Sequence, residues 1–273
     1  MLERRGISAA PATFEAEAGH LIPRQQILGI SVSCTSYDHA VQTIGDWARR
    51  CLSKYVCVAP VSSVMEAYDS DEFRRVMNNA DLVTPDGVPL VWSLRCLGFP
   101  QAVRVYGPDL TLRLLAMAES CGLAVGFYGG DSRTLDRLCH AISRRFPALR
   151  VAYSCSPPFR QLALEEDQDA VDEINASKAR ILFIGLGSPK QDYWMAAHKG
   201  QIHAVMIGVG AAFDFLAGTK RQAPRWMMKI GMEWLFRFAN EPRRLWKRYL
   251  KHNPRFVILF ALQVLGWKSF SRN

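Results

Sequence analysis

Residues 181–194 read ILFIGLGSPKQDYW, an apolar run that meets two glycines, a proline and a lysine before a segment of helical composition. The run Ile181–Ile184 is short and apolar, which is typical of a buried strand. Gly185 and Gly187 allow backbone conformations that other residues avoid, and Pro189 suits the first turn of a helix. The stretch therefore predicts a strand, a loop and a helix, the repeating unit of a parallel α/β sheet.

The loop 185–191 is also a candidate phosphate site, because a glycine loop before a helix presents N–H groups and the positive end of the helix dipole. The alternative is a tight turn that binds nothing. Pro189 and Lys190 stand where a dinucleotide fingerprint needs its third glycine, and the Gly-Lys-Ser/Thr of a P-loop is missing. A nicotinamide or ATP site is therefore disfavoured, whereas a nucleotide diphosphate site is not.

The same alternation of apolar runs and helical patterns continues on both sides of this stretch, from residue 27 to residue 218. It predicts a doubly wound, Rossmann-like and mostly parallel sheet. The expected strands are Tyr55–Ala59, Leu82–Thr84, Ala124–Tyr128, Val151–Ser154, Ile181–Ile184 and Val205–Val209. The expected helices are His39–Leu52, Ser63–Asn78, Leu110–Ser120, Ser132–Phe146, Asp167–Ser177 and Lys190–His198.

Composition narrows the class of protein. The seven cysteines of the 273 residues never form a C-x-x-C pair, which indicates free thiols in a reducing compartment. The sequence contains no H-E-x-x-H motif and no close pair of histidines, so it gives no sign of a metal site. Residues 1–26 contain three glutamates and no apolar core, so we expect a loose leader and not a signal peptide. These features predict a cytoplasmic protein.

Glycine-rich or acidic loops follow four of the expected strands: 84–87, 129–130, 185–191 and 210–214. Because parallel strands end at one edge of a sheet, these loops predict a ligand cleft there. Asp86 lies in a Pro-Asp-Gly sequence that suits either an ordinary turn or a catalytic acid at a strand end. Asp214, between two phenylalanines, is a second candidate acid, for which a structural, capping role is favoured.

Eight motifs in order carry a resemblance to a known family: VTPDGVPLVW (83–92), RVYGPDL (104–110), GFYGG (126–130), SPPFR (156–160), FIGLGSPKQDYW (183–194), GVGAAFDFLAG (208–218), GMEWLFR (231–237) and EPRRLWKRY (241–249). Together they resemble the WecG/TagA/CpsF glycosyltransferases over about residues 27–255. The resemblance implies inverting transfer of a hexose from a UDP-sugar to a sugar on a polyprenyl diphosphate. It also implies that Asp86 is the general base.

The chain departs from the family pattern at two places. Residues 59–67 read APVSSVMEA where the family often has an Asn followed by Thr or His, so either Ser62 or Ser63 makes that substrate contact or the contact is lost. The family's R-A-P is Gln222-Ala223-Pro224 here, with Arg221 one position earlier. This shift leaves open which basic group of the loop reaches the diphosphate.

The C-terminal segment 219–273 holds 13 Lys and Arg against two Glu, and the first 218 residues hold 21 basic against 23 acidic residues. Trp226, Ile230, Trp234 and Phe238 recur every four residues, which predicts one amphipathic helix after Pro224. A second basic helix should restart at Glu241-Pro242. The run 256–267 is too short to span a membrane. It is either a core helix or, with its basic neighbours, a segment that docks on anionic lipid, in which case Phe256, Leu259 and Phe260 would contact lipid.

The sequence thus predicts three parts: a leader 1–26, an α/β nucleotide-sugar-binding catalytic domain 27–218 and a basic, membrane-docking helical appendage 219–273. We expect a UDP-sugar-dependent hexosyltransferase, peripherally attached to the inner face of the cell membrane, which moves glucose, N-acetylmannosamine or a uronic acid form. No metal or further cofactor and no nucleic acid are expected. The rival interpretations are a basic nucleic-acid-binding protein and a non-catalytic UDP-sugar sensor.

The predicted roles follow from the motifs and the resemblance. Asp86 is the base, the loop 185–191 surrounds the UDP diphosphate, the tail arginines stabilise the leaving group, and Arg104 and Asp109 line the sugar pocket. The full set of substrate-binding candidates is Ser62, Thr84, Arg104, Asp109, Gly129, Gly185, Gly187, Pro189, Lys190, Gln191, Asp214, Arg221, Arg237, Arg244 and Arg248.

Overall fold

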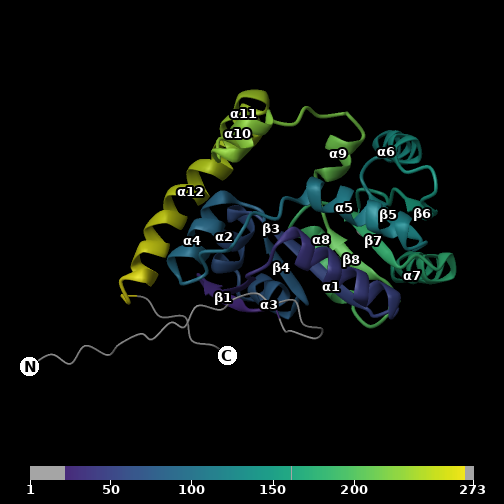
Figure 1. The fold of residues 1–273 in the computed structure, drawn as a ribbon, viewed down its shortest axis with the longest axis horizontal. Helices are drawn as coiled ribbons and strands as arrows, with labels where there is room; N and C mark the ends of the chain where they lie inside the picture. Colours follow the sequence, from purple (N-terminus) through teal and green to yellow (C-terminus); the bar gives the residue numbers. More distant parts are fainter. Residues whose placement is uncertain (1–21, 161, 268–273) are drawn as a thin grey trace, which may run out of the picture.

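In the computed structural model, which describes residues 22–160 and 162–267, six strands form one parallel sheet in the order β4-β3-β8-β7-β5-β6 (Figure 1). The predicted α/β class with a parallel, Rossmann-like sheet is confirmed. The strands are β3 (Lys54–Ala59), β4 (Leu82–Pro85), β5 (Val125–Gly129), β6 (Val151–Cys155), β7 (Ile181–Gly185) and β8 (Val205–Gly208).

Helices cover both faces of the sheet because the central strands bury both of their faces. In β7, Ile181 and Phe183 face one core, whereas Leu182 and Ile184 face the other. The first core receives α1 (Tyr37–Arg49), α5 (Gly107–Ser120), α6 (Ser132–Arg145) and α9 (Ala212–Leu216). The second core receives α2 (Val61–Asp69), α3 (Asp71–Asn79), α4 (Val88–Cys96), α7 (Leu164–Ser177) and α8 (Lys190–Ala197).

Three elements differ from the sequence prediction. One helix was expected over Ser63–Asn78, but Ser70 is extended and caps a new helix, so α2 and α3 are separate. Helix α4 was not predicted, since it begins with the apolar run VPLVW, which contains a proline and shows no clear helical period. An antiparallel hairpin of β1 (Arg24–Ile27) and β2 (Ile30–Ser33) was also missed.

The hairpin bears on the expected leader. Strand β1 starts at Arg24, so residues 24–26 of the segment 1–26 belong to a strand. Residues 1–21 lie outside the described part of the chain. The side chain of Arg24 reaches the sheet, where it donates a hydrogen bond of 2.7 Å to the carbonyl oxygen of Ala80.

The described part of the basic C-terminal segment, residues 219–267, forms three helices: α10 (Arg225–Lys229), α11 (Glu233–Asn240) and α12 (Pro242–Val264). A single helix was expected from Trp226 to Phe238, but Gly231 takes a φ of 78°, a left-handed conformation that breaks it. Helix α12 runs without a break through Pro254, so the apolar run is the end of one long helix along the flank of the fold (Figure 1).

One face of α12 packs on the core of the α/β unit. Phe256 is buried in the core that also contains α2, and Leu259 and Phe260 pack against it. Arg255 makes a double hydrogen bond of 2.9 and 2.7 Å to Asp69 at the end of α2. Gln263 accepts from the backbone N–H of Leu28 at 2.9 Å and so ties α12 to the β1–β2 turn. No helix among residues 22–160 and 162–267 could cross a membrane.

Candidate active site

Two cavities meet at the carboxyl ends of the central strands, and Asp86 lies in the wall of both. The larger one is a cleft of about 870 Å³ above the loops that follow β3, β4, β5, β7 and β8. The smaller one, about 340 Å³, is mainly apolar and lies between α4, α11 and α12. Pro60, Ser62 and Arg237 are shared by the two walls. This junction brings a polar site and an apolar site to one carboxylate.

Asp86 follows β4 directly, and its backbone N–H donates to the carbonyl oxygen of Ala59 at 3.0 Å, which fixes the turn against β3. Its side chain is about one fifth exposed. Burial raises the pKa of the Asp86 carboxyl, the guanidinium of Arg104 opposes this shift, and the carboxylate of Glu233 adds to it. A carboxylate with a raised pKa at the junction of two cavities is suited to accept a proton.

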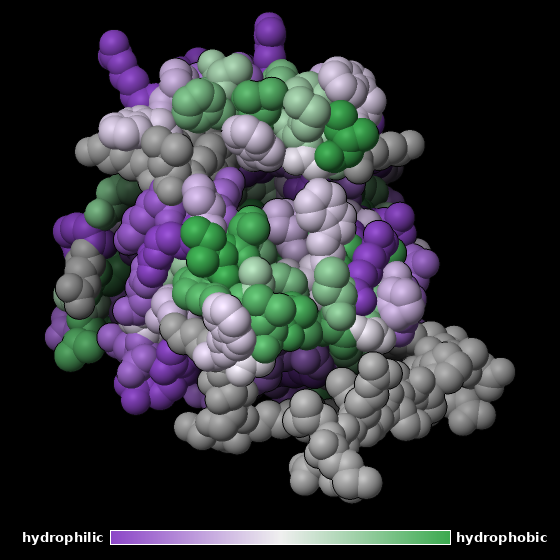
Figure 2. Space-filling view, turned by 90° about the vertical axis from the view of Figure 1, so that its left-hand side faces the viewer, coloured by the Kyte–Doolittle hydropathy of each residue, from purple (hydrophilic) through white to green (hydrophobic). Residues whose placement is uncertain are grey.

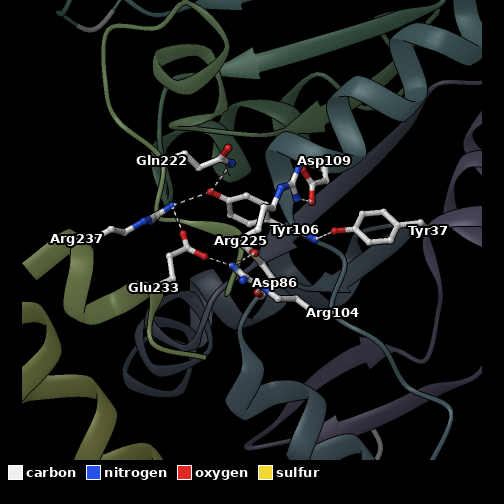
Figure 3. A network of polar contacts seen from close by, with 9 residues as sticks. All are labelled: Tyr37, Asp86, Arg104, Tyr106, Asp109, Gln222, Arg225, Glu233 and Arg237. Carbon is white, nitrogen blue, oxygen red and sulfur yellow. Dashed lines mark hydrogen bonds and ion pairs between the residues drawn. The ribbon is translucent and has the colours of Figure 1, made fainter. Parts of the chain in front are cut away.

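A network of charged and aromatic side chains surrounds Asp86 (Figure 3). Arg104 Nη2 donates to Asp86 Oδ1 at 3.1 Å and to Glu233 Oε2 at 2.6 Å. Arg237 Nη2 lies 2.8 Å from Glu233 Oε1 and 3.5 Å from the hydroxyl oxygen of Tyr106. The guanidinium of Arg104 also lies 4.4 Å from the centre of the Tyr106 ring. One network of charged contacts therefore joins the loop after β4, the loop before α5 and helix α11.

Arg237 has a donor that this network does not use. Its Nε atom is buried and has no hydrogen-bond partner among the described residues. A buried guanidinium N–H without a partner costs free energy unless an anion or another acceptor occupies the site. Arg237 lines both cavities, so its positive charge can act on a negatively charged ligand between them, although the Nε atom itself is closed to solvent.

Gln191 fastens the glycine loop after β7 to the loop after β8. Its Oε1 atom accepts hydrogen bonds of 3.1 Å from the backbone N–H groups of Gly187 and Gly210. The side chain is buried, and Gly187 has the positive φ of 79° that its glycine allows. The N–H of Gly187, one of those expected to hold phosphate, is thus occupied by Gln191. We infer that Gln191 shapes the floor of the cleft.

Both serines at the start of α2 reach the site. Ser62 lines both cavities and Ser63 lines the large cleft. The hydroxyl of Ser63 lies 3.1 Å from that of Ser188 in the loop after β7. Ser188 in turn contacts the buried carboxyl of Asp192, whose pKa burial raises. Ser63 is committed to the loop, which leaves Ser62 as the freer hydroxyl beside Asp86.

Asp214 stands on another wall of the large cleft, in α9. Its Oδ2 atom lies 3.0 Å from Lys220 Nζ, and its Oδ1 atom accepts from the hydroxyl of Thr219 at 3.2 Å. Lys220 and Arg221 line the same cleft. Asp214 is already paired and does not line the apolar cavity, so its geometry favours a substrate contact over the role of base.

Several predicted site residues do not line either cavity. Asp109 is paired with Arg225 Nη1 at 2.7 Å, and Thr84 is fully buried with an unpartnered hydroxyl. Gly129 is buried against Gly185, where a Cβ atom would lie 2.7 Å from the backbone, so its glycine is required by packing. The side chains of Arg244 and Arg248 lie outside the described residues. The remaining residues outside both walls are Pro189 and Lys190.

Sequence reasoning did not identify Glu233, Tyr106 or Trp92 as site residues. Glu233 and Tyr106 stand inside two quoted motifs, GMEWLFR and RVYGPDL, which was the available signal. Trp92, Ile230 and Trp234 line the apolar cavity and are each about half exposed. They give that cavity its hydrophobic wall.

Gly185 provides a test of how tightly the cleft floor is built. A Cβ atom there would lie 2.5 Å from the ring of Phe213, which is buried and packs edge-on against Phe127. Gly185→Ala should therefore lower the free energy of unfolding by about 1–3 kcal/mol and weaken UDP binding. Denaturant unfolding and calorimetry measure both quantities.

Gly45→Ala in α1 is the matched control, since its Cβ atom would meet only the flexible ends of two side chains, Met117 at 3.3 Å and Arg49 at 3.5 Å. Stability close to that of the parent is expected there, because alanine is the better helix former. If Gly185→Ala and Gly45→Ala changed the free energy of unfolding equally, the packing around Gly185 would be able to accommodate the added methyl group.

Comparison with known proteins agrees with this geometry. The sequence profile of the glycosyl transferase WecG/TagA/CpsF family matches residues 25–269. The chain belongs to this family. The family resemblance predicted from the eight motifs is confirmed, and so is its class, an enzyme that transfers a sugar.

The chain is similar to two curated members of the family, both named N-acetylglucosaminyldiphosphoundecaprenol N-acetyl-beta-D-mannosaminyltransferase. The one from Bacillus spizizenii is 28% identical over 193 residues, which cover 70% of this chain and 72% of that protein. The one from Staphylococcus aureus (strain MW2) is 27% identical over 208 residues, 76% of this chain and 79% of that protein.

The described residues contain no group of three or more His, Cys, Asp or Glu side chains that could hold a metal ion. The charged groups that line the cavities include the cations of Arg104, Lys220, Arg221 and Arg237. These cations make the cavities suited to an anionic ligand.

Proposed function

We propose that this glycosyltransferase moves a hexose from a UDP-sugar to a sugar carried on a polyprenyl diphosphate, with inversion at the anomeric carbon. The observation that carries the proposal is the position of Asp86 between a polar cleft and an apolar cavity. The large cleft suits a nucleotide diphosphate sugar, since glycine loops and cations line it. The apolar cavity suits the lipid-linked acceptor, whose sugar hydroxyl would then meet Asp86.

The proposed step is a single displacement. Asp86 takes the proton of the acceptor hydroxyl as its oxygen bonds to the anomeric carbon and the bond to the UDP oxygen breaks. Negative charge develops on the leaving diphosphate. The cations of Arg237, Arg221 and Lys220, which all line the large cleft, would stabilise that charge. We propose that these cations serve in place of a metal ion.

The two relatives suggest the first substrates to test, because their name specifies transfer of N-acetylmannosamine to N-acetylglucosaminyl diphosphoundecaprenol. A panel of UDP-sugars, each incubated with synthetic N-acetylglucosaminyl diphosphate lipid in the presence of a chelator, identifies the donor. A lipid-linked disaccharide from one donor is expected. Donor binding without product from any member of the panel would favour the rival interpretation, a non-catalytic sensor.

We further propose that the tail docks on an anionic membrane surface, where such an acceptor would lie. Exposed apolar side chains gather on the face formed by α4, α10, α11 and α12 (Figure 2). Exposed basic residues flank them. The exposed apolar side chains are Trp92, Trp226, Ile230, Trp234, Leu235, Val257, Ile258, Val264, Leu265 and Trp267.

The structure changes the residues expected to meet lipid. Phe256, Leu259 and Phe260 were the expected contacts, but they pack on the core, so serine there would loosen α12 instead. The opposite face of the same helix, with Ile258 and Val264, is more than half exposed. The apolar run is therefore a core helix on one face and a free surface on the other.

Replacing Ile258, Val264 and Leu265 together by serine should lower binding to phosphatidylglycerol vesicles at least about tenfold, because each apolar side chain buried in lipid contributes roughly 1.5–3 kcal/mol. Turnover of a water-soluble acceptor should stay within about twofold of the parent, since none of the three lines a cavity. Cosedimentation in the absence of RNA measures the binding.

Leu164→Ser is the control, because Leu164 is 91% exposed at the start of α7, away from the tail. Its vesicle binding should match that of the parent. Undiminished vesicle binding by the triple variant would contradict the docking face. Binding of the parent to RNA and not to vesicles would favour the nucleic-acid interpretation.

A further inference from the structure

Glu233 is the first residue of α11 and is only 7% exposed, which is unusual for a charged side chain. Its two carboxylate oxygens are divided between two arginines: Oε2 accepts from Arg104 Nη2 at 2.6 Å, and Oε1 lies 2.8 Å from Arg237 Nη2. Arg104 belongs to the loop between α4 and α5, whereas Glu233 and Arg237 belong to the tail (Figure 3). Glu233 is thus a buried carboxylate whose ion pairs link the α/β unit to the tail.

The same nitrogen of Arg104 serves two carboxylates. Nη2 donates to Glu233 at 2.6 Å and to Asp86 at 3.1 Å, so the contact with Glu233 is the shorter. Arg104 Nε is bound to the backbone carbonyl oxygen of Asp86 and cannot turn to its carboxylate. Because Nη2 carries two N–H groups, it donates to both carboxylates at once, and Glu233 holds the guanidinium at the shorter distance while Asp86 shares its positive charge.

The titratable groups around Asp86 come from three places: the loop before α5, helix α11 and helix α1. Arg104 precedes α5, and Glu233 and Arg237 lie on α11. The hydroxyl groups of Tyr106, in the loop before α5, and of Tyr37, in α1, lie near Arg104. Helix α4, which follows Asp86, begins with Val88 and Pro89 and adds no charge in its first turn. The charges of the two carboxylates, Asp86 and Glu233, and of the two guanidiniums, Arg104 and Arg237, sum to zero. Among these groups, Glu233 is the acidic partner of Asp86.

We propose, on the basis of the proposed function, that Glu233 is a positioning residue: it draws the guanidinium of Arg104 away from Asp86 and so keeps Asp86 able to accept a proton while α11 covers the site. When α11 is displaced, Glu233 and Arg237 leave together, and Arg104 pairs with Asp86 alone. An aspartate paired with a full guanidinium holds its charged form and is a weaker base. The base is then active only under a seated tail, which limits hydrolysis of the donor in the open protein.

Glu233→Gln in the full chain is the first test, because glutamine keeps the size of the side chain and removes its charge. The carboxyl carbon of Asp86, labelled with ¹³C and assigned by its loss in Asp86→Asn, reports the titration of Asp86 directly. We expect the titration midpoint to move to lower pH, since a neighbouring negative charge is gone. The acid limb of the pH–rate profile should move in the same direction and the plateau should fall about tenfold, with the KM for the UDP-sugar within about threefold.

Two further variants complete the test. Glu233→Asp withdraws the carboxylate from Arg104 by one methylene, so its midpoint should lie between those of the parent and Glu233→Gln, and it decides the matter if Glu233→Gln does not fold. Asp69→Asn removes an exposed ion pair of the tail at Arg255, away from Asp86, but leaves Phe256 packed in the core, so α11 should stay seated and the midpoint should stay unmoved.

An Asp86 midpoint that is unchanged in the Glu233 variants would overturn the proposed role of Glu233. The NMR titration does not depend on turnover, so this outcome differs from failure of the proposed function. If the parent transferred no sugar while the midpoint still moved as expected, the function would be wrong and the electrostatic role would stand.

Discussion

Asp86→Asn is expected to reduce the rate of sugar transfer by about 10²-fold or more, the usual contribution of a general base, while the Kd for UDP stays within about threefold. Asparagine has the shape of aspartate but cannot take the proton of the acceptor hydroxyl. The Asp86 side chain is held by Arg104 at the junction of the two cavities, whereas the glycine loops that shape the donor cleft do not depend on it. Single-turnover kinetics and calorimetry with UDP separate the two effects.

Asp214→Asn is the matched comparison, because Asp214 is the other acidic candidate from the sequence. It is paired with Lys220 in the donor cleft, so its replacement should weaken donor binding more than it slows the bound complex. Transfer by Asp86→Asn at a near-normal rate, together with a large rate loss in Asp214→Asn, would reverse the assignment of the base.

Arg237→Met should lower kcat by about 10²-fold, in the range found when one donor to a developing negative charge is removed. Arg237 lines both cavities, and its guanidinium lies 5.2 Å from the centre of the Phe215 ring. Methionine keeps most of the stem that packs there. Steady-state kinetics with a soluble acceptor removes any contribution from membrane docking.

Arg255→Met is the control from the same tail, since Arg255 is paired with Asp69 and touches neither cavity. An exposed pair of this kind contributes about 0–1 kcal/mol, so kcat should remain within about twofold. Vesicle binding should be nearly equal in the two variants, because each removes one positive charge of many. Equal kcat values in the two variants would remove Arg237 from the catalytic account.

The α/β sheet could be predicted because its central strands are buried on both faces and read as continuous apolar runs. Ile181–Ile184 is the clearest example, and the structure extends it by one residue to Gly185. The β1–β2 hairpin could not be found in the same way, since its strands are four residues long with polar residues among them. Gly231 lies at the break between α10 and α11, whereas the four-residue spacing of the aromatic residues predicted one continuous helix.

The site was predictable to the extent that its residues follow strands. Asp86 and the loop 185–191 come straight after apolar runs, and the edge of a parallel sheet brings such loops together. The partnership of Glu233 with Arg104 joins segments 129 residues apart and depends on how the tail folds back. No local pattern encodes that distance. For the same reason Asp109, adjacent to the YGP motif, was expected in the sugar pocket but is paired with Arg225 instead.

The most direct test of the proposed reaction is mass spectrometry of the lipid product after incubation of the full chain with UDP-N-acetylmannosamine and N-acetylglucosaminyl diphosphate lipid. The account predicts one lipid-linked disaccharide, formed at least about 10²-fold faster by the parent than by Asp86→Asn. Equal product from the parent and Asp86→Asn, or no product from this or any other UDP-sugar, would contradict it.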